Sequence, residues 1–388
     1  MEFLLGDADY WLIENAMCLE QLVSIYYYGR SGSVFLQSLL DSHPQVLMVP
    51  GTVLMFYADF WKRYSHLSQD ALIEKFCGYF ASFFDVHADV KMGEWKQPSI
   101  VLSFNKMGEN RDEVVSINKD KFLQALKLIF EKNELTSKSL FQAVHVAYTI
   151  ALGRAGNLDR KNLPLIAHQA HLPGYYDGVM LLAKDFPSFK IIQMVREPLQ
   201  TLGSHVKWQW KDYLPSSYGD AFPLVSNEAI VVRLEDLHTE PESTLKKLAQ
   251  WLNIDWNDVL LQSTFDGKKW WNVQGVEQVT GFNQVTISKN HDDIYFPMDK
   301  YRLKILYGKR YVLWRYASKK PPLWKTLTLL PLLMLPFKIE FIIFKQLYRE
   351  NKLSGLNYGL FVWWRKRRMY FKAWRYALSS KIKEPRCL

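Results

Sequence analysis

Residues 23–50 read VSIYYYGRSGSVFLQSLLDSHPQVLMVP. An apolar run breaks at Gly29-Arg30-Ser31-Gly32-Ser33 and then resumes with helical spacing, which predicts a strand, a tight turn and a helix over about Val23 to Leu40. Such a turn presents backbone N–H groups, two hydroxyls and one guanidinium at a helix N-terminus, where unpaired donors and the helix dipole favour a phosphate or sulfate. The loop is therefore predicted to bind an anion.

The residues around this unit predict an α/β fold. The apolar run Val46 to Pro50 is expected to form a neighbouring parallel strand, which gives a βαβ start. Strand and helix patterns then alternate, which predicts a doubly wound, mostly parallel central sheet flanked by helices. The expected strands are 163–169, 190–195 and 230–237; the expected helices lie within 56–64, 71–84, 121–132, 199–209 and 242–252; and 89–118 reads as a strand-and-loop insertion.

The loop lacks the lysine of a nucleotide triphosphatase. A Walker A motif requires Lys after its last glycine, and here Ser33 follows Gly32, whereas Arg30 stands before the glycine. GRSGSVFLQSLLDSHP, residues 29–44, resembles the 5′-phosphosulfate loop of the sulfotransferases that use 3′-phosphoadenosine 5′-phosphosulfate (PAPS), which have a P-loop-like fold. The resemblance implies that the backbone and side chains of the loop bind the 5′-phosphate of the nucleotide. One departure is Val34, where many members carry a second hydroxyl residue. The loop residues assigned to the nucleotide are Gly29, Arg30, Ser31, Gly32, Ser33 and Val34.

A second motif strengthens the resemblance. KIIQMVREPLQTLGSH, residues 190–205, places Arg196 at the end of a buried strand and Ser204 eight residues later on the following helix, within reach of a common point. In the family, a strand ending in Arg with a Ser at this spacing binds the 3′-phosphate. A surface ion pair of Arg196 with Glu197 or Glu235 remains the alternative. The block 230–253 also resembles the family, and there Glu235 and Asp236 are expected to have a structural role.

The resemblance implies transfer of a sulfuryl group from PAPS, as co-substrate, to an acceptor hydroxyl or amine. No metal is required. Arg30 and Ser33, with the N–H groups of the loop, are placed to stabilise the leaving 5′-phosphate. A small-molecule kinase with a phosphate loop, or a non-catalytic nucleotide-binding protein recruited to a membrane, remains an alternative.

Two histidines are candidates for the general base that accepts the proton of the acceptor. Cytosolic members of the family carry their catalytic His before Leu-Pro, a little over twenty residues upstream of the strand-end Arg, and His171 stands in this setting. Its ordinary pKa of about 6.5 suits proton abstraction at neutral pH. His168, on the preceding strand, is the second candidate, and His43 is expected to be structural. Pro50-Gly51-Thr52 offers no carboxylate where carbohydrate sulfotransferases place a Glu.

The segment 263–272, STFDGKKWWN, carries Lys268, Lys269 and two Trp residues. It either closes over the nucleotide or packs its Trp residues in the core with the lysines in solvent, and the sequence leaves both readings open. Three widely spaced cysteines argue against a disulfide framework or zinc site, and the N-terminal residues show no secretory signal, so a cytoplasmic location is expected.

Charge divides the chain into two parts. Residues 301–388 hold 21 of the 49 Lys and Arg residues and 3 of the 39 Asp and Glu residues, a net charge of +18, whereas residues 1–300 carry −8. We therefore expect a sulfotransferase domain over 1–300, with a helical acceptor-side insertion at about 52–160, and a basic aromatic extension over 301–388.

The extension has the composition of a membrane-surface segment. TLTLLPLLMLPF, residues 326–337, is apolar but too short and too rich in proline to span a bilayer, and 358–383 interleaves aromatic and basic residues. Peripheral association with an anionic membrane is predicted, with an acceptor that is a membrane-linked glycan or glycolipid. Nucleic-acid binding is disfavoured, and a packed subdomain with a cationic face is the remaining alternative.

Overall fold

The structure is a computed structural model that describes residues 4–27, 29–51, 53–92, 95–98, 104–170, 176–207, 228–272, 279–349, 356–379 and 386–388. Its centre is a parallel sheet in the order β10-β7-β6-β1-β5-β2. The strands are β1 (Gln21–Tyr27), β2 (Val46–Met48), β5 (Leu165–Gln169), β6 (Ser188–Val195), β7 (Ala229–Arg233) and β10 (Arg386–Cys387). The predicted α/β fold with a parallel sheet flanked by helices is confirmed.

The position of β2 corrects the predicted start of the fold. β2 is parallel to β1 but is not its neighbour, because β5 lies between them and pairs with both. A strand that arrives more than one hundred residues later is inserted beside β1, and no local pattern encodes that choice of neighbour. The strand order reverses at β1, which has β6 on one side and β5 on the other. In open α/β sheets, ligands bind at such a switch point, beyond the carboxyl ends of the strands.

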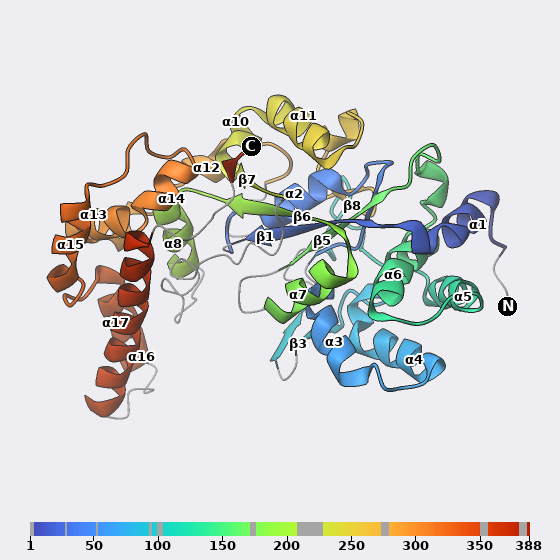
Figure 1. Cartoon of the computed structure of the whole chain (residues 1–388), viewed down its shortest axis with the longest axis horizontal. Helices are drawn as coiled ribbons and strands as arrows, with labels where there is room; N and C mark the ends of the chain where they lie inside the picture. The colour runs from blue at the N-terminus through green and yellow to red at the C-terminus, as the bar shows by residue number, and fades with distance from the viewer. Residues whose placement is uncertain are drawn as a thin grey trace.

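Helices cover both faces of the sheet (Figure 1). α2 (Ser33–Leu40), α10 (Leu234–Thr239) and α11 (Pro241–Leu252) pack on one face, in a core formed with residues such as Val23 and Ile192. On the other face lies a larger core built mainly from aromatic and aliphatic helix residues. Its helices are α1 (Asp7–Glu14), α3 (Tyr57–Tyr64), α4 (Gln69–Tyr79), α5 (Lys119–Phe130), α6 (Ser137–Ala151), α7 (Tyr176–Asp185) and α8 (Pro198–Lys207).

Most of the predicted elements are present, with one change of type. The strand expected over 230–237 ends at Arg233, and Glu235 and Asp236 lie in the first turn of α10. Acidic residues stabilise the first turn of a helix because they face the positive end of its dipole, and this favours the end of the strand at this point. Two short hairpins are also present: β3 (Asp89–Met92) with β4 (Trp95–Pro98), and β8 (Thr264–Phe265) with β9 (Lys268–Lys269).

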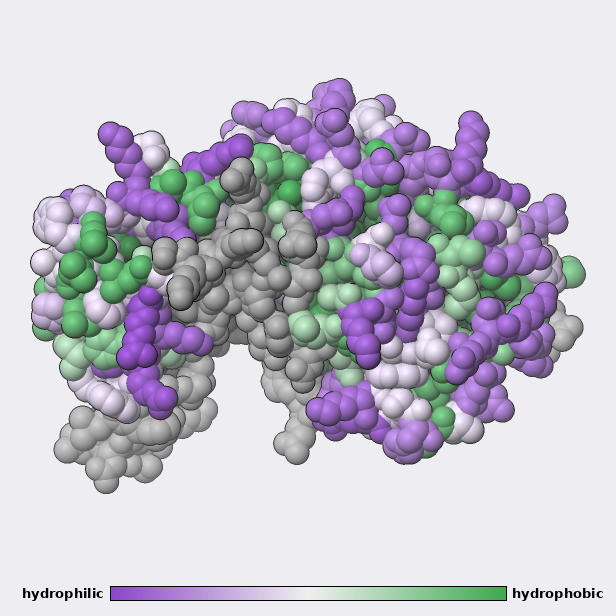
Figure 2. All heavy atoms as spheres, viewed as in Figure 1, coloured by the Kyte–Doolittle hydropathy of each residue, from purple (hydrophilic) through white to green (hydrophobic). Residues whose placement is uncertain are grey.

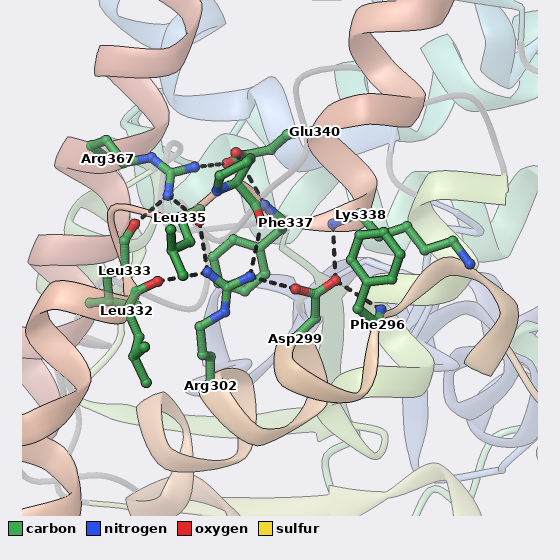
Figure 3. Close-up of polar contacts among 11 residues, drawn as sticks. Phe296, Asp299, Arg302, Leu332, Leu333, Leu335, Phe337, Lys338, Glu340 and Arg367 are labelled. Atoms are coloured by element: carbon green, nitrogen blue, oxygen red, sulfur yellow. Dashed lines mark hydrogen bonds and ion pairs between the residues drawn. The ribbon is translucent and has the colours of Figure 1, made fainter.

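The C-terminal residues form a helical unit at one end of the sheet (Figure 1). Its elements are α12 (Val285–Ser288), α13 (Pro297–Leu306), α14 (Gly308–Leu313), α15 (Leu323–Leu332), α16 (Lys338–Arg349) and α17 (Leu356–Leu378). Two buried arginines hold these helices together (Figure 3). Arg302 of α13 donates to the carbonyls of Leu332 and Leu335, each over 2.7 Å, and pairs with Asp299. Arg367 of α17 donates to the Leu335 carbonyl over 2.9 Å and pairs with Glu340.

The chain returns from these helices to the sheet. β10 pairs with Ile230 and Val231 of β7, and Leu388 N–H donates to the Val231 carbonyl over 2.9 Å. The guanidinium of Arg315 donates to the Leu388 carbonyl over 3.0 Å. The sheet therefore includes a strand from the basic extension. None of the helices among the described residues is long and apolar enough to cross a bilayer.

Candidate functional site

The loop between β1 and α2 has a backbone that requires glycine. Gly29 and Gly32 have φ of 49° and 85°, and Arg30 also lies in the left-handed region at 55°. Gly32 is the N-cap of α2, and a Cβ built there would lie 2.3 Å from Cδ1 of Leu234. An L-residue at Gly32 would therefore meet both backbone strain and a close contact. The predicted turn into a helix is present, and it lies at the carboxyl end of a central strand.

The second motif lies beside this loop. β1 and β6 are neighbours, with Tyr27 opposite Met194, so the loop after β1 and Arg196 after β6 share one edge of the sheet. Nε of Arg30 donates to Oγ of Ser204 on α8 over 3.0 Å, and Nη2 of Arg196 donates to the carbonyl of Thr286 over 3.1 Å. The loop and the second motif are therefore in contact through Arg30 and Ser204. The predicted helix 199–209 begins at Pro198, and its expected last two residues lie outside the described ranges.

Two guanidinium groups, those of Arg30 and Arg196, bring positive charge close together at this edge. Burial, and after it the nearby charge of Arg196, lowers the pKa of Arg30 to about 10. The ring of His238, stacked on Phe35, has its pKa lowered to about 4 by burial and then by Arg196. Like charges held this close repel each other, and a multiply charged anion placed between them relieves that repulsion. The electrostatics of the edge fit a nucleotide phosphate.

The serines of the loop differ in their contacts. Ser31 is fully buried, and its Oγ has no hydrogen-bond partner among the described residues. Ser33 accepts a hydrogen bond of 2.9 Å from Nε2 of Gln169, at the end of β5. Val34 packs against the core on the α2 face, so it offers no polar contact. A buried hydroxyl without a protein partner is costly unless a ligand or water satisfies it, which fits an anion bound in the loop.

The sequence interpretation missed Gln169 and Thr286 as parts of this edge. Gln169 follows His168 at the end of β5, and Thr286 lies on α12, 90 residues after the arginine that it contacts. Neither residue stands in a recognisable motif. The parallel register of β5 beside β1 is the feature that brings Gln169 to the loop.

The two predicted bases lie in different settings. His168 is buried, edge-on to Phe141 of α6, and burial together with neighbouring His145 lowers its pKa to about 3. A histidine with so low a pKa is too weak a base to take the proton of a substrate hydroxyl efficiently at neutral pH. His171 lies outside the described residues.

Other polar residues have structural roles. Nδ1 of the buried His43 accepts from the N–H of Gln45 over 3.1 Å, as expected of a helix-end residue. Asp236 pairs with Arg233, and Glu235 accepts two hydrogen bonds within the fold. These contacts agree with the structural role expected of Glu235 and Asp236.

The β8–β9 hairpin lies away from the phosphate loop. Its Asp266 and Gly267 donate backbone N–H groups to Asp41, which directly follows the C-terminal end of α2, whereas the loop is at the N-terminal end. Trp270 is buried in the core. The lysines bond to the segment before α5: Lys268 to the Val114 carbonyl and Lys269 to Glu109, each over 2.7 Å. Trp270 packs as the second reading expects, whereas Trp271 is half-buried and both lysines bind other groups of the fold.

A comparison with protein families agrees with the two motifs. A family profile described as "Sulfotransferase family" matches residues 28–258. Among solved structures, the sulfotransferase domain of the Synechococcus PCC 7002 olefin synthase is 14% identical, covers 71% of this chain and 89% of its own, and has a TM-score of 0.34. The sulfotransferase domain from the curacin biosynthetic pathway is 14% identical, with coverages of 71% and 90% and a TM-score of 0.33. A sulfotransferase from Mycobacterium tuberculosis is 11% identical, with coverages of 64% and 74% and a TM-score of 0.29. A search of curated proteins gave no match.

Proposed function

This chain belongs to the sulfotransferase family, whose members are PAPS-dependent transferases, and we propose that it moves a sulfuryl group from PAPS to a hydroxyl or amine of a membrane-linked glycan or glycolipid. The observation that carries the proposed nucleotide site is the contact of Arg30 with Ser204, which joins the two anion-binding motifs at one edge of the sheet. The loop residues 29–34 would hold the 5′-phosphate, and Arg196 and Ser204 would hold the 3′-phosphate.

The chain's own residues would supply positioning and charge. Transfer forms an S–O or S–N bond to the acceptor and breaks the S–O bond to the 5′-phosphate, so negative charge grows on the phosphate oxygen that leaves. In this proposal Arg30 and the N–H groups at the start of α2 would lie at that oxygen and would stabilise the charge. His171 is proposed to take the proton of the acceptor, since the low pKa of His168 makes it a weak base.

The proposed link to a membrane rests on α15 and α16. α15 buries Thr326 and Leu329 against the C-terminal core, yet the opposite side is also apolar, and Leu323, Trp324 and Leu327 are 65%, 60% and 51% exposed. Figure 2 shows hydrophobic residues gathered at the end of the molecule where Figure 1 places α13 and α15. The exposed set continues with Leu330, Met334, Leu335, Phe341, Ile342 and Tyr348. An apolar surface of this extent on a helix pair is typical of a surface that meets lipid or another molecule.

Charge favours an anionic lipid surface as the partner. Among the described residues after position 300, Glu340 is the one acidic side chain, and Arg367 neutralises it. Basic side chains remain exposed around it on the same helical unit: Lys319, Lys320, Lys345, Arg368, Lys372 and Arg375. α17 buries Arg367, Tyr370 and Ala373 against its neighbours. Its exposed side carries Arg368, Lys372 and Arg375, so the cations of α17 and the exposed apolar residues of α15 and α16 would together meet the membrane.

The first test of this function is nucleotide binding and turnover. The wild-type protein is expected to show a higher Tm with 3′,5′-ADP than without it, and to transfer radioactive sulfate from labelled PAPS to a membrane lipid extract. Mg²⁺ should not be needed for transfer, whereas a kinase would require it. If 3′,5′-ADP neither binds nor changes the Tm, the assigned nucleotide site is wrong; if label moves to soluble sugars alone, the proposed acceptor class is wrong.

A further inference from the structure

Two tyrosines of the C-terminal unit contact the carboxylates beside the proposed 3′-phosphate site. Tyr311, on α14, donates a hydrogen bond to Oε1 of Glu197, and Tyr316 donates one to Oε2 of Glu235 over 2.6 Å. We propose that Tyr311 and Tyr316 are positioning residues for the nucleotide, acting through Glu197 and Glu235 on Arg196 and Ser204. This inference rests on the proposed function, because it assumes that Arg196 and Ser204 bind the 3′-phosphate.

Glu197 controls the start of the helix that carries Ser204. It directly precedes α8, and its Oε2 accepts the N–H of Gln200 over 2.8 Å, as an N-cap residue does. The carboxylate thus fixes the first turn of α8, and Ser204 lies on the same short helix. Because Tyr311 binds the other oxygen of this carboxylate, it fixes the orientation in which the cap forms.

Glu235 fixes the peptide that follows Arg196. Its Oε1 accepts the backbone N–H of Glu197 over 3.0 Å, and that N–H belongs to the peptide bond between Arg196 and Glu197. Tyr316 holds the other oxygen of Glu235, and the guanidinium of Arg233 lies 5.2 Å from the centre of the Tyr316 ring. The carboxylate of Glu235 therefore ties the backbone of Arg196 to the C-terminal unit, in addition to the bond from its side chain to the Thr286 carbonyl.

The negative charges of Glu197 and Glu235 explain why these two carboxylates need hydroxyl donors. Burial raises the pKa of Glu197 above its ordinary value, and the nearby Glu235 raises it further, whereas the hydrogen bond from Tyr311 lowers it. Two carboxylates so close to a phosphate site would repel the ligand and each other, unless hydrogen-bond donors bind the carboxylates and hold them away from the ligand. Tyr311 and Tyr316 are neutral donors, so they satisfy the carboxylates without competing with the phosphate for positive charge.

The two glutamates connect the tyrosines to the backbone that carries the proposed phosphate ligands. The four oxygens of the two glutamates are shared between the two tyrosines and two N–H groups, those of Glu197 and Gln200. Each tyrosine is therefore linked, through the carboxylate of one glutamate, to the backbone that carries a proposed phosphate ligand. Residues 311–316 are part of the nucleotide site in this view, although the family profile ends at residue 258.

Removal of the hydroxyl groups alone tests the proposal in the full chain. Tyr311→Phe with Tyr316→Phe is expected to weaken 3′,5′-ADP binding about 10-fold, as the loss of hydrogen bonds to charged groups would. The affinity for 5′-AMP, which lacks the 3′-phosphate, should change much less. Tyr376→Phe is the matched control, because Tyr376 is buried in the same unit and its hydroxyl has no hydrogen-bond partner among the described residues. Tyr376→Phe should leave both affinities unchanged.

A second variant separates positioning from packing. Glu197→Gln removes the buried charge, so adding Tyr311→Phe to it should cost less 3′,5′-ADP affinity than Tyr311→Phe costs in the wild type. If the double Phe variant binds 3′,5′-ADP as the wild type does, or loses 5′-AMP affinity equally, the positioning role is refuted. If the wild type itself fails to bind 3′,5′-ADP, the proposed function fails instead, so the two failures are distinguishable.

Discussion

A Cβ atom built on Gly203 would lie 2.2 Å from Cβ of His291. Gly203 immediately precedes Ser204 on α8, and His291 is bound to the same helix, because its N–H donates to Oε1 of Gln200 over 3.1 Å. The segment that carries His291 also carries Thr286, whose carbonyl accepts from Arg196. The absence of a side chain at Gly203 thus allows this segment to lie against the helix of the proposed 3′-phosphate site.

Gly203→Ala should therefore weaken nucleotide binding. Either α8 or the 286–291 segment must move, and both carry groups of the site, so we expect roughly 10-fold weaker 3′,5′-ADP binding and a loss of about 1–3 kcal/mol in stability. Helix propensity alone would make Ala more stable than Gly by about 1 kcal/mol. Isothermal titration and urea unfolding measure the two effects.

Gly178→Ala on α7 serves as the control for that substitution. A Cβ there meets its nearest atom at 3.7 Å, which is ordinary contact. We expect unchanged nucleotide affinity and slightly higher stability. Equal behaviour of the two alanine variants would contradict the role assigned to the contact with His291.

Arg196→Ala should change selectivity between nucleotides. Loss of a guanidinium that binds the 3′-phosphate should reduce 3′,5′-ADP affinity about 10- to 100-fold, since a hydrogen bond to a charged group contributes about 1.5–3 kcal/mol. Binding of 5′-AMP should stay near the wild-type value. Competition between the two nucleotides gives both constants, and an equal loss for each would place Arg196 elsewhere in the site.

Asp266→Asn should flatten the pH dependence of stability. Burial, and then Asp41, raises the pKa of Asp266 from 3.8 to about 7 in the folded state. The folded chain therefore holds this proton more tightly than the unfolded chain. The protonated carboxyl of Asp266 contributes fully to the free energy of unfolding below about pH 4, and this contribution is lost as the pH rises toward 7. Asn keeps the neutral form and tolerates the left-handed φ of 53° at this position.

Urea unfolding at several pH values between about 4 and 7 measures this effect. The free energy of unfolding of the variant, relative to the wild type, should increase with pH across that window. Asp292→Asn is an opposite control, because Lys300 lowers the pKa of the exposed Asp292, so its contribution is lost as the pH falls. Parallel pH curves for wild type and Asp266→Asn would contradict a buried, protonated Asp266.

Serine substitutions at Leu323, Trp324 and Leu327 should release the protein from anionic vesicles. These side chains are the most exposed apolar groups on α15, and their loss should lower sedimentation with phosphatidylserine vesicles at least about 10-fold. This variant leaves β10 and the buried arginines in place, so it is a sharper test than removal of the extension.

The same triple change elsewhere provides the control. Val114, Leu163 and Met180 are exposed apolar residues of the first 300 residues, and their replacement by serine should leave sedimentation unchanged. Neutral phosphatidylcholine vesicles should bind the wild type more weakly than anionic vesicles. If the α15 variant still sediments with anionic vesicles, α15 is not the membrane-binding surface.

Local patterns were sufficient to predict the two strand–loop–helix units that carry the proposed phosphate ligands. The loop and Arg196 each follow an apolar strand and precede a helix, and parallel strands bring such loops to one edge of a sheet. The pairing of strands was not predictable in the same way. β5 lies between β1 and β2 because of contacts between distant segments, and the alternation of strands and helices does not encode which strands are neighbours.

The C-terminal unit shows the same limit. The aromatic and basic residues of α17 have the composition of a membrane-surface helix, yet Arg367 is fully buried, since Glu340 and the carbonyl of Leu335 surround its guanidinium. The contact of Tyr311 with Glu197 joins residues 114 positions apart. Composition identifies a cationic segment, but tertiary contacts decide which of its faces is exposed.

The short strand β10 has a consequence for folding and self-association. Its pairing with β7 closes a loop of more than 150 residues, so loop closure should make it one of the late steps in folding. Until that step, the N–H and C=O groups along one side of β7 stay open, as on any sheet edge that can pair with another chain. Intermediates that lack β10 should therefore aggregate by strand pairing, and refolding yield should fall as protein concentration rises.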